Sequence, residues 1–587
     1  MVKNARVYSI TPKVLALGVL VFSLFLAGCQ QVAPATDDFT SKAGVKIEAA
    51  LPDQIVLFFK LGTKNPDQIK QFKTLNSYFP GDAMGEFVKN FNEGFKSGGK
   101  FEELGLDFDR DIKPIVAEDS QLFVVISDLK PEHLEIMAAF TLADIGKFDA
   151  LIARQKEVQK ADYNGNSVLT MTGEDGSKMY MSRVKDTVFV SISEEGLKGA
   201  LDRMTKGDVA SARNATFARA MKDAGANLAV AFVDLKTVSA TLQSGMDEAS
   251  RAEMEQTLRM FGNGEDVLDM LDSEVFAASV ENDGLRVAAT VYGKEGADLS
   301  KFSPADGAYY LAKQIPAKFP LIYFEGSGFT KVYDVLLKSI EAQEETKLNF
   351  EEFKKSISEI GLDFENDIVA VMDKGLAAVL EDNGSVIPSI GFYLDASGKP
   401  ESAQKIAGKI NEAMDGLMSQ ALAESPDVAM IMSKEEVVSE KLWKIKVNFD
   451  ALLMGAPENI AKKLSGQKIE LYFGLVGNDI LTIALKPDLE TVYGKSGAVS
   501  DAAEFKQALG YLKGADKSVS FLSPAMTMSY IDRVVQLAKE SGAVAATDLQ
   551  QYEALKAYVM PMKSLAIGST GLEGNKIRSE IFLHIGR

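Results

Sequence analysis

Gly105-Leu106-Asp107-Phe108-Asp109-Arg110-Asp111-Ile112 recurs in the second half of the chain as Gly361-Leu362-Asp363-Phe364-Glu365-Asn366-Asp367-Ile368. An apolar, strand-like segment led by a proline precedes each copy, at residues 51–59 and 315–324. One matching octapeptide could arise by chance, but an ordered series of matching segments could not easily do so. We therefore expect a tandem duplication of a unit of roughly 250 residues, which is too long a period for a solenoid repeat.

The segments that follow the two octapeptides also match in order. Apolar strands come first, then a helix, another strand and a short helix, a segment with small residues before a Phe, and a closing pair of strands. The matching ranges are 121–126 and 376–380, 135–141 and 387–394, 144–158 and 401–422, 186–192 and 479–485, 215–220 and 503–508, 228–233 and 518–522, and 274–292 and 564–584.

The fold class follows from the lengths and connections of these segments. Many strands are short and are joined by hairpin-length turns, such as residues 281–284. Helical segments separate the others, and in one of them Met84, Phe87, Val88 and Phe91 form one apolar stripe. Hairpins and clustered helices favour an α+β fold. We therefore expect a tandem duplication of a domain with a largely antiparallel sheet and packed helices.

The pattern resembles a family of uncharacterised bacterial envelope proteins known as domain of unknown function 3352. The resemblance lies in Leu51-Pro52, the glycines Gly105 and Gly361 that open the octapeptides, Ala139-Phe140-Thr141, and residues 214–217. It covers most of the first copy, and the second copy matches less closely. The resemblance implies an architecture, and it brings no known activity, cofactor or catalytic residue.

The N-terminal segment reads as an export signal. Lys3, Arg6 and Lys13 precede an apolar run from Val14 to Ala27. This run is short of the roughly 20 residues that a helix needs to cross a bilayer. The run closes on residues 26–29, Leu-Ala-Gly-Cys, which resemble the lipobox of bacterial lipoproteins. The alternatives are an uncleaved anchor and an ordinary signal peptide with a chance cysteine.

The lipobox resemblance implies cleavage between Gly28 and Cys29 and acylation of the Cys29 thiol. The protein would then be exported and held on the cell envelope through the lipid on Cys29. Gln30 follows the cysteine, where an aspartate commonly signals retention in the inner membrane. The position therefore favours the outer membrane if two membranes are present.

These observations divide the chain into five expected parts. The linker between the repeats is rich in Gly, Ser, Asp and Lys. The parts are a signal peptide (1–28), a flexible tether (29–47), a first α+β domain (48–293), the linker (294–314) and a second α+β domain (315–587).

Composition excludes several classes of function. The formal net charge is −19, and no basic cluster offsets it, so we expect no nucleic-acid partner. Cys29 is the only cysteine, which leaves no thiol for a disulfide once it is acylated. Stability must then come from the packed cores.

No metal or cofactor site is expected. The two histidines, His133 and His584, lie in different copies, and zinc sites usually need several His or Cys ligands. A calcium-loop spacing is present, but Ile112 occupies the position that needs glycine, and Lys374 replaces the last carboxylate in the second copy. The acidic residues with this spacing are Asp107, Asp109, Asp111 and Glu118. We interpret the octapeptide as a polar turn whose Asp caps a short helix.

No catalytic residue is expected either. Ser97 with Lys100, and Ser182 with Lys185, have the Ser-x-x-Lys spacing of some acyl-enzymes. A chain with this many serines and lysines produces such spacings by chance, and neither pair has the companion motifs.

Three functional hypotheses remain. The first is a non-enzymatic, membrane-anchored binding or structural module, whose partner is an envelope protein or an apolar ligand. The second is a carrier or chaperone for lipid or outer-membrane protein clients, since Phe- and Met-rich walls suit varied apolar ligands. The third is an envelope hydrolase that uses carboxylates or Ser97 and Lys100.

Overall fold

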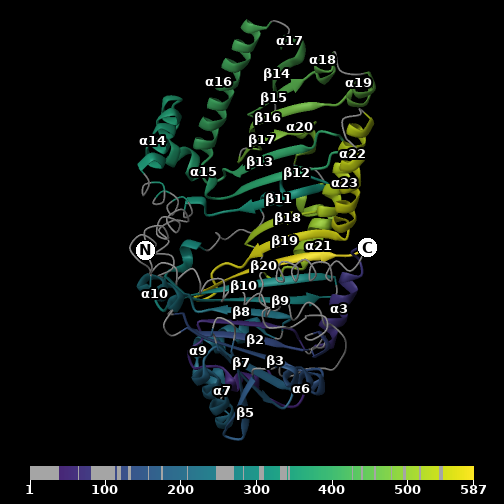
Figure 1. Ribbon diagram of the computed structural model, residues 1–587. Helices are drawn as coiled ribbons and strands as arrows, with labels where there is room; N and C mark the ends of the chain where they lie inside the picture. Colours follow the sequence, from purple (N-terminus) through teal and green to yellow (C-terminus); the bar gives the residue numbers. More distant parts are fainter. Residues whose placement is uncertain are drawn as a thin grey trace. The chain divides into compact units, whose positions relative to one another are not determined.

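The structure is a computed structural model, shown in Figure 1. It describes residues 39–80, 113–245 and 270–587, with short gaps inside these ranges. The gaps fall at 64, 116–119, 130–133, 156–157, 173–175, 177, 208, 226, 282, 303–309, parts of 331–343, 426–427, 438–440, 455–457, 478, 494–496, 515–516 and 541–545. The chain forms two compact units that divide between Gly296 and Ala297, and each is described by itself.

The first unit contains one antiparallel sheet of ten strands. Its order is β4-β5-β6-β7-β3-β2-β1-β8-β9-β10. The strands are β1 (Leu57–Leu61), β2 (Leu122–Asp128), β3 (Glu135–Thr141), β4 (Val158–Tyr163), β5 (Asn166–Thr172), β6 (Lys178–Val184), β7 (Thr187–Ser191), β8 (Ala229–Val233), β9 (Leu271–Glu281) and β10 (Gly284–Gly293).

The second unit repeats this sheet strand for strand. Its order is β14-β15-β16-β17-β13-β12-β11-β18-β19-β20, again antiparallel throughout. The strands are β11 (Pro320–Gly326), β12 (Leu376–Glu381), β13 (Ser389–Asp395), β14 (Met432–Val437), β15 (Leu442–Val447), β16 (Ile469–Val476), β17 (Ile480–Leu485), β18 (Ser518–Leu522), β19 (Met562–Ser569) and β20 (Lys576–Ile585). Ten strands in one non-sequential order, found twice, confirm the predicted tandem duplication and the α+β class.

Helices connect the strands in both units. Those of the first unit are α2 (Ile47–Ala50), α3 (Pro66–Asn76), η2 (Lys113–Ile115), α6 (Ile145–Arg154), α7 (Glu194–Lys206), α8 (Ala210–Arg213), α9 (Ala215–Ala224) and α10 (Leu235–Gly245). Those of the second are η3 (Leu299–Phe302), η4 (Leu311–Lys313), α14 (Glu344–Glu359), η5 (Phe364–Val369), α15 (Ala370–Met372), α16 (Pro400–Glu424), α17 (Val428–Ile431), α18 (Phe449–Leu452), α19 (Glu458–Leu464), α20 (Leu489–Val492), η6 (Val499–Asp501), α21 (Ala503–Gly510), α22 (Pro524–Glu540) and α23 (Ala546–Val559).

The main core of the first unit is built around an aromatic triad. Phe217 of α9 lies edge-on against Phe58 of β1 and Phe232 of β8, with ring centroids 5.1 and 5.4 Å away. The two strand residues are direct cross-strand partners. Asn214 caps α9 by accepting from the Phe217 N–H at 2.9 Å, which fixes the helix start above the sheet.

The second unit has the same triad. Phe505 of α21 lies edge-on against Tyr323 of β11 and Phe521 of β18, at 5.3 and 5.4 Å. Tyr323 and Phe521 are again cross-strand partners. The expected equivalence of Phe217 and Phe505 therefore holds in their packing, because each fills one socket above the same pair of strands.

The second octapeptide forms a capped helical turn, as predicted. The Asp363 carboxylate accepts from the Asn366 N–H at 2.7 Å and begins η5, a π-helix. Leu362 and Ile368 pack in the cluster beneath α16. The first octapeptide lies outside the described residues.

Two predicted connecting segments are shorter than expected. Val45 and Ile47, placed in the tether (29–47), are buried in the first core. Leu311 and Ala312, placed in the linker (294–314), are fully buried in the second. Both segments are short and show no strand or helix periodicity, so they were expected to be connectors, although their apolar side chains pack in the cores of their units.

Candidate apolar binding face

Most residues considered for chemistry lie outside the described part of the chain. They are Gly28, Cys29, Ser97, Lys100, Asp107, Asp109, Asp111, Glu118 and His133. Of the described ones, Ser182 is fully buried, the Lys185 ammonium donates to the Ala43 carbonyl at 2.9 Å, and the His584 ring packs 5.3 Å from Tyr511. Across the described ranges, no group of three His, Cys, Asp or Glu side chains could hold a metal ion. Within those same ranges no helix is both long and apolar enough to cross a membrane.

The second unit's sheet has apolar residues on both faces. One face packs on Tyr323 and Phe505 in the main core. On the opposite face, cross-strand neighbours form two adjacent rows. The rows run over seven strands in the spatial order β17-β13-β12-β11-β18-β19-β20. The first row is Ile483, Phe392, Ala378, Phe324, Ser520, Ile567 and Ile581, and the second is Leu485, Ile390, Leu380, Ile322, Leu522, Leu565 and Leu583. We call these two rows the apolar face.

Many of these side chains are exposed. Phe392 is 53% exposed, and Ile322 and Phe324 are each 43% exposed. Ile390, Ile483, Ile567 and Ile581 also rank among the exposed large apolar residues. With strands about 4.8 Å apart, seven strands give a floor roughly 29 Å wide. Soluble proteins rarely expose a continuous apolar patch without a binding role.

The first unit has diverged at the equivalent positions. Ala138, Ala231 and Ala289 stand where the second unit has Phe392, Ser520 and Ile581. Glu274 replaces Leu565, and burial raises the pKa of its carboxyl. Phe59 and Phe276 keep aromatic rings at the positions of Phe324 and Ile567, so the two faces differ in individual side chains.

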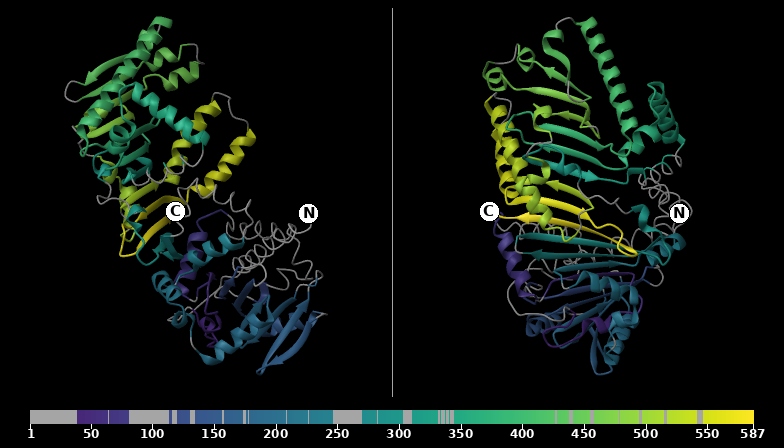
Figure 2. Two further views of the ribbon diagram at one scale, coloured as in Figure 1. Left: turned by 90° about the vertical axis from the view of Figure 1, so that its left-hand side faces the viewer. Right: turned by 180° about the vertical axis from the view of Figure 1, so that it is seen from behind.

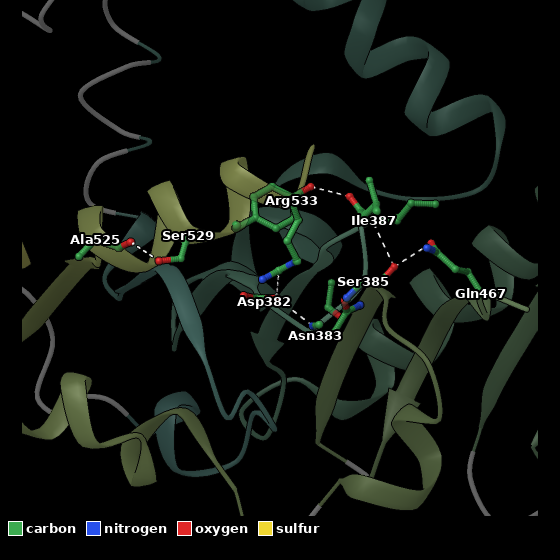
Figure 3. A network of polar contacts seen from close by, with 12 residues as sticks. Asp382, Asn383, Ser385, Ile387, Gln467, Ala525, Ser529 and Arg533 are labelled. Carbon is green, nitrogen blue, oxygen red and sulfur yellow. Dashed lines mark hydrogen bonds and ion pairs between the residues drawn. The ribbon is translucent and has the colours of Figure 1, made fainter. Parts of the chain in front are cut away.

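Helix α22 borders one end of the apolar face. It packs against β19 and β11. The Tyr530 hydroxyl donates to the Val386 carbonyl at 2.7 Å, and Arg533 pairs with Asp382, which ties α22 to the β12–β13 loop (Figure 3). Figure 2 shows α22 and α23 on one side of the second unit's strands. The connection fixes the ends of the strands that carry Ile322 and Ile390.

The row at the opposite strand ends is mixed. Leu481, Leu394 and Leu376 continue the face on β17, β13 and β12, and the first two pack in the cluster beneath α16. After Gly326 on β11, the row continues as Ser518, Ser569 and Ser579, and the first two hydroxyls are 3.2 Å apart. The face therefore becomes polar along the strand direction only on β18, β19 and β20.

A pocket of about 270 Å³ opens at the same ends of β11, β12 and β13. Its polar lining comes from the ends of β11, β12 and β13 and from neighbouring loops: Tyr310, Glu325, Ser327, Lys374, Asp395, Ser397 and Lys517. We call it the strand-end pocket. Gly326 also lines it, and a Cβ at that position would lie 3.2 Å from the Phe324 ring. Glu325 and Asp395 alternate along their strands with Phe324 and Leu394, so the pocket lies on the Tyr323 side of the sheet, opposite the apolar face.

Internal partners occupy the acidic groups of the strand-end pocket. Glu325 accepts hydrogen bonds from the Leu311 and Ala312 N–H groups at 2.9 and 3.1 Å and from the Tyr323 hydroxyl at 2.5 Å. Burial raises the pKa of the Glu325 carboxyl, although these hydrogen bonds oppose the shift. Asp395 accepts from the Ser397 N–H and hydroxyl at 3.0 and 2.6 Å.

Sequence reasoning missed the apolar face, although a signal was present. β11 reads Leu321-Ile322-Tyr323-Phe324, so the side chains on both faces of this strand are apolar. Such a run indicates a strand with two apolar faces. It does not show whether both faces are covered.

Comparison with known proteins identifies a family but no activity. The family model described as "Protein of unknown function (DUF3352)" matches residues 14–585. No curated protein sequence matches the chain. Among solved structures, crystal forms IV and III of TP0453 align at 6% and 7% identity, with TM-scores of 0.23 and 0.22. They cover 43% and 44% of this chain and 82% and 80% of theirs. Similarity at this level supports no conclusion about the fold or function of this chain.

Proposed function

Because the chain belongs to the DUF3352 family of proteins of unknown function, we propose its role from its own residues: a lipid-anchored, non-enzymatic envelope protein that binds an apolar ligand on the second unit's sheet. The observation that carries this proposal is the apolar face, with Phe324 and Phe392 exposed at its centre. Burying such side chains is worth about 1.5–3 kcal/mol each. A ligand that covers several of them gains enough free energy for stable binding.

The apolar face favours a binding or carrier role over the other hypotheses. A hydrolase needs a nucleophile or paired acid and base within reach of each other. The apolar face offers no such group, since Ser520 is its only polar member and has no basic side chain beside it in the two rows. An apolar surface instead matches a ligand whose affinity comes from the hydrophobic effect.

A dye-binding experiment tests the role of the apolar face. The soluble form, residues 30–587, should bind 1-N-phenylnaphthylamine, an uncharged dye that fluoresces in apolar surroundings. Replacing Phe324 and Phe392 together with Ser should weaken binding about tenfold or more, since two large contacts are lost. Leu417→Ser is the matched control, because Leu417 is 60% exposed on α16, outside the apolar face. Equal binding by all three proteins would contradict the proposal.

The membrane anchor needs a separate test. The basic residues, short apolar run and Leu26-Ala27-Gly28-Cys29 support acylation of Cys29. Cells that express the wild type should incorporate radiolabelled palmitate into the protein, and Cys29→Ala should abolish the label. Cys29→Ala should also shift the protein from the membrane fraction to the wash. Equal labelling would refute the anchor without affecting the apolar face.

A further inference from the structure

We propose that the strand-end pocket is a second binding site, which takes a small primary amine in its protonated form with Asp395 as the acceptor. The pocket lies on the Tyr323 side of the sheet, so this site is separate from the apolar face and does not rest on the function proposed above. Three features of the pocket support an amine: its open space, the charges that line it, and one carboxylate oxygen that accepts no hydrogen bond.

The space is open because Gly375 stands where the first unit has a glutamine. In the second unit the Asp395 N–H donates to the Gly375 carbonyl at 2.9 Å. The same bond in the first unit joins the Thr141 N–H to the Gln121 carbonyl at 3.0 Å, so Gln121 is the equivalent of Gly375. Gln121 is fully buried, whereas a Cβ on Gly375 would lie 3.4 Å from Asp395 and 3.6 Å from Leu311. The shared sheet therefore accommodates a long side chain at a place that the second unit leaves open.

The shared fold does not require the acidic groups of the pocket. The first unit has the neutral Thr141 at the position of Asp395, and the Thr141 hydroxyl accepts from the Gln121 N–H at 2.8 Å. It has Lys60 at the position of Glu325. Burying a carboxylate is unfavourable unless a cation or hydrogen bonds compensate. At Asp395 the second unit therefore has a destabilising group that the first unit does without, and a bound cation would offset it.

One oxygen of Asp395 lacks a hydrogen-bond donor. Asp395 is only 5% exposed, and both hydrogen bonds from Ser397 go to its Oδ1 atom. Within the described part of the chain, Oδ2 accepts no hydrogen bond, and the Lys374 ammonium lies 3.9 Å from it, beyond hydrogen-bond distance. Most buried side-chain oxygens have a donor. Since Asp395 lines the pocket, an N–H group of a ligand there would supply one.

The surroundings of Asp395 favour a cation over a neutral donor. Glu325 lines the same pocket, and internal hydrogen bonds already occupy both of its carboxylate oxygens. Burial raises the pKa of the Glu325 carboxyl, and the charge of Asp395 adds to this shift. Asp479, which accepts from the Tyr310 hydroxyl at 3.4 Å, is a third carboxylate beside the pocket. A cation that enters therefore relieves repulsion between acids that are already close together.

Two lysines, Lys374 and Lys517, also line the pocket. The Lys374 side chain is 54% exposed, and its ammonium donates to the Ser397 hydroxyl. Lys374 therefore lies at the mouth of the pocket, whereas Asp395 is buried. There the Lys374 ammonium competes with an entering amine for Asp395, but it would attract an anion. Removing its charge thus has opposite effects on the two classes of ligand.

The size of the pocket suits a short-chain amine. Its volume of about 270 Å³ is several times the roughly 30 Å³ that one water molecule occupies in the liquid. Tyr310 and Leu311 provide apolar wall for a short alkyl chain. No group of three His, Cys, Asp or Glu side chains in the described ranges could hold a metal ion. An ammonium group is therefore the cation that this pocket fits.

Ligand-observed NMR tests the site with butylamine, butanol and butyrate, which share an alkyl chain and differ in charge. Saturation-transfer titrations of the soluble form, residues 30–587, at pH 7 should show butylamine binding about tenfold more tightly than butanol. Butyrate should bind more weakly than either. Asp395→Asn should reduce the affinity for butylamine to that for butanol. Lys374→Gln should strengthen butylamine binding about two- to threefold, because it removes the competing ammonium.

Gly375→Gln introduces the side chain that the first unit has at this position, and it should abolish butylamine binding by filling the pocket. Asp501→Asn is the matched control, because Asp501 is exposed and pairs with Lys506 at 3.6 Å outside the pocket. It should leave all three affinities unchanged. Circular dichroism of each variant checks that it is folded. Asp395→Asn and Gly375→Gln test two different residues, so the experiment still decides if one of them unfolds.

Equal binding of butylamine and butanol by the wild type would overturn the amine site. A preference for butylamine that survives in folded Asp395→Asn or Gly375→Gln would place the binding elsewhere and overturn it too. Weaker butylamine binding by Lys374→Gln, or tighter binding of butyrate than of butylamine by the wild type, would assign the pocket to an anion instead. Each of these results leaves the apolar face unaffected, because dye binding tests that surface separately.

Discussion

Phe217 and Phe505 show how single residues define each unit. Each is fully buried and contacts one aromatic ring on each of two paired strands. Edge-to-face ring pairs add about 0.5–1.5 kcal/mol beyond the burial of their area. The two positions therefore hold a helix on the central strands in the same way in both units.

Phe505→Ala should lower the free energy of unfolding of the second unit by about 3–5 kcal/mol, because it leaves a cavity above β11 and β18. Urea unfolding followed by circular dichroism measures the change. Leu417→Ala, at an exposed position, should change stability by less than about 0.5 kcal/mol. If Phe505→Ala changed stability as little as the control, the packing of Phe505 against Tyr323 and Phe521 would be contradicted.

Charge at equivalent positions differs between the units. Lys60 lies two residues after Phe58, and Glu325 lies two residues after Tyr323. Both side chains are buried, and the Lys60 ammonium donates to the Asn227 carbonyl at 3.0 Å. This position can bury a side chain of either charge because backbone groups bond to both. A carbonyl accepts from the Lys60 ammonium, and N–H groups donate to the Glu325 carboxylate.

Glu325 also makes stability depend on pH. Burial raises the pKa of its carboxyl in the folded state, so the protonated form contributes stability that is fully present below the unfolded value of 4.5 and is lost as pH rises through the folded pKa. Relative to Glu325→Gln, the wild type should gain stability as the pH falls from 7 towards 4.5. Urea unfolding of both proteins across this range measures the difference. If the wild type instead lost stability relative to Glu325→Gln as the pH falls, the raised pKa of Glu325 would be contradicted.

At the scale of elements, α22 holds the β12–β13 loop through few contacts. Tyr530 bonds to the Val386 carbonyl, and Arg533 pairs with Asp382, whose carboxylate also accepts from the Gly384 N–H at 2.8 Å. The loop begins where the strands of the apolar face end (Figure 3). Gln467 also bonds to Ser385 at 2.8 Å, so α22 is one of two partners distant in sequence that hold the loop.

Arg533→Ala should loosen this loop. We expect faster hydrogen exchange at residues 383–388 and a loss of about 1–2 kcal/mol of stability, since a partly buried Asp382 loses its ionic partner. Tyr530→Phe removes only one neutral hydrogen bond and should have a smaller effect. Unchanged exchange in the loop of Arg533→Ala would show that α22 does not restrain it.

At the scale of the whole molecule, duplication produced two sheets with one topology and separate cores. The aromatic triad of one unit shares no residue with that of the other. The equivalent faces have diverged at individual positions, since Ala138 and Ala289 in the first unit stand where the second unit has Phe392 and Ile581. One copy could therefore change its exposed face while the other kept the common fold.

Separate cores predict separate responses to mutation. Phe217→Ala should speed hydrogen exchange in β1, β2, β8 and β9, because these strands carry or adjoin its socket. Exchange in β11, β12, β18 and β19 should remain as in the wild type. Mass spectrometry of the intact chain reports both sets of strands in one experiment. Equal loss of protection in both would contradict independent cores.

The sequence by itself determined the duplication and the α+β class. The octapeptides at Gly105 and Gly361, and the ordered segments after them, require related chain paths, because similar apolar patterns with similar turns pack alike. The positions of Phe217 and Phe505 followed from that order. The burial of the ends of the tether and linker did not follow from the sequence, because Val45 and Leu311 are not part of a helical or strand-like apolar pattern.

Only the tertiary structure decided which apolar side chains remain exposed. Ile322-Tyr323-Phe324 is apolar on both sides of its strand, and local sequence cannot tell which side a helix will cover. α21 covers the side of Tyr323, whereas Phe324 and Phe392 remain exposed on the other side. The strand-end pocket likewise joins Lys374, Asp395 and Lys517, which meet only when distant strands pair. Exposure depends on how whole layers assemble, and a single strand's pattern does not contain that information.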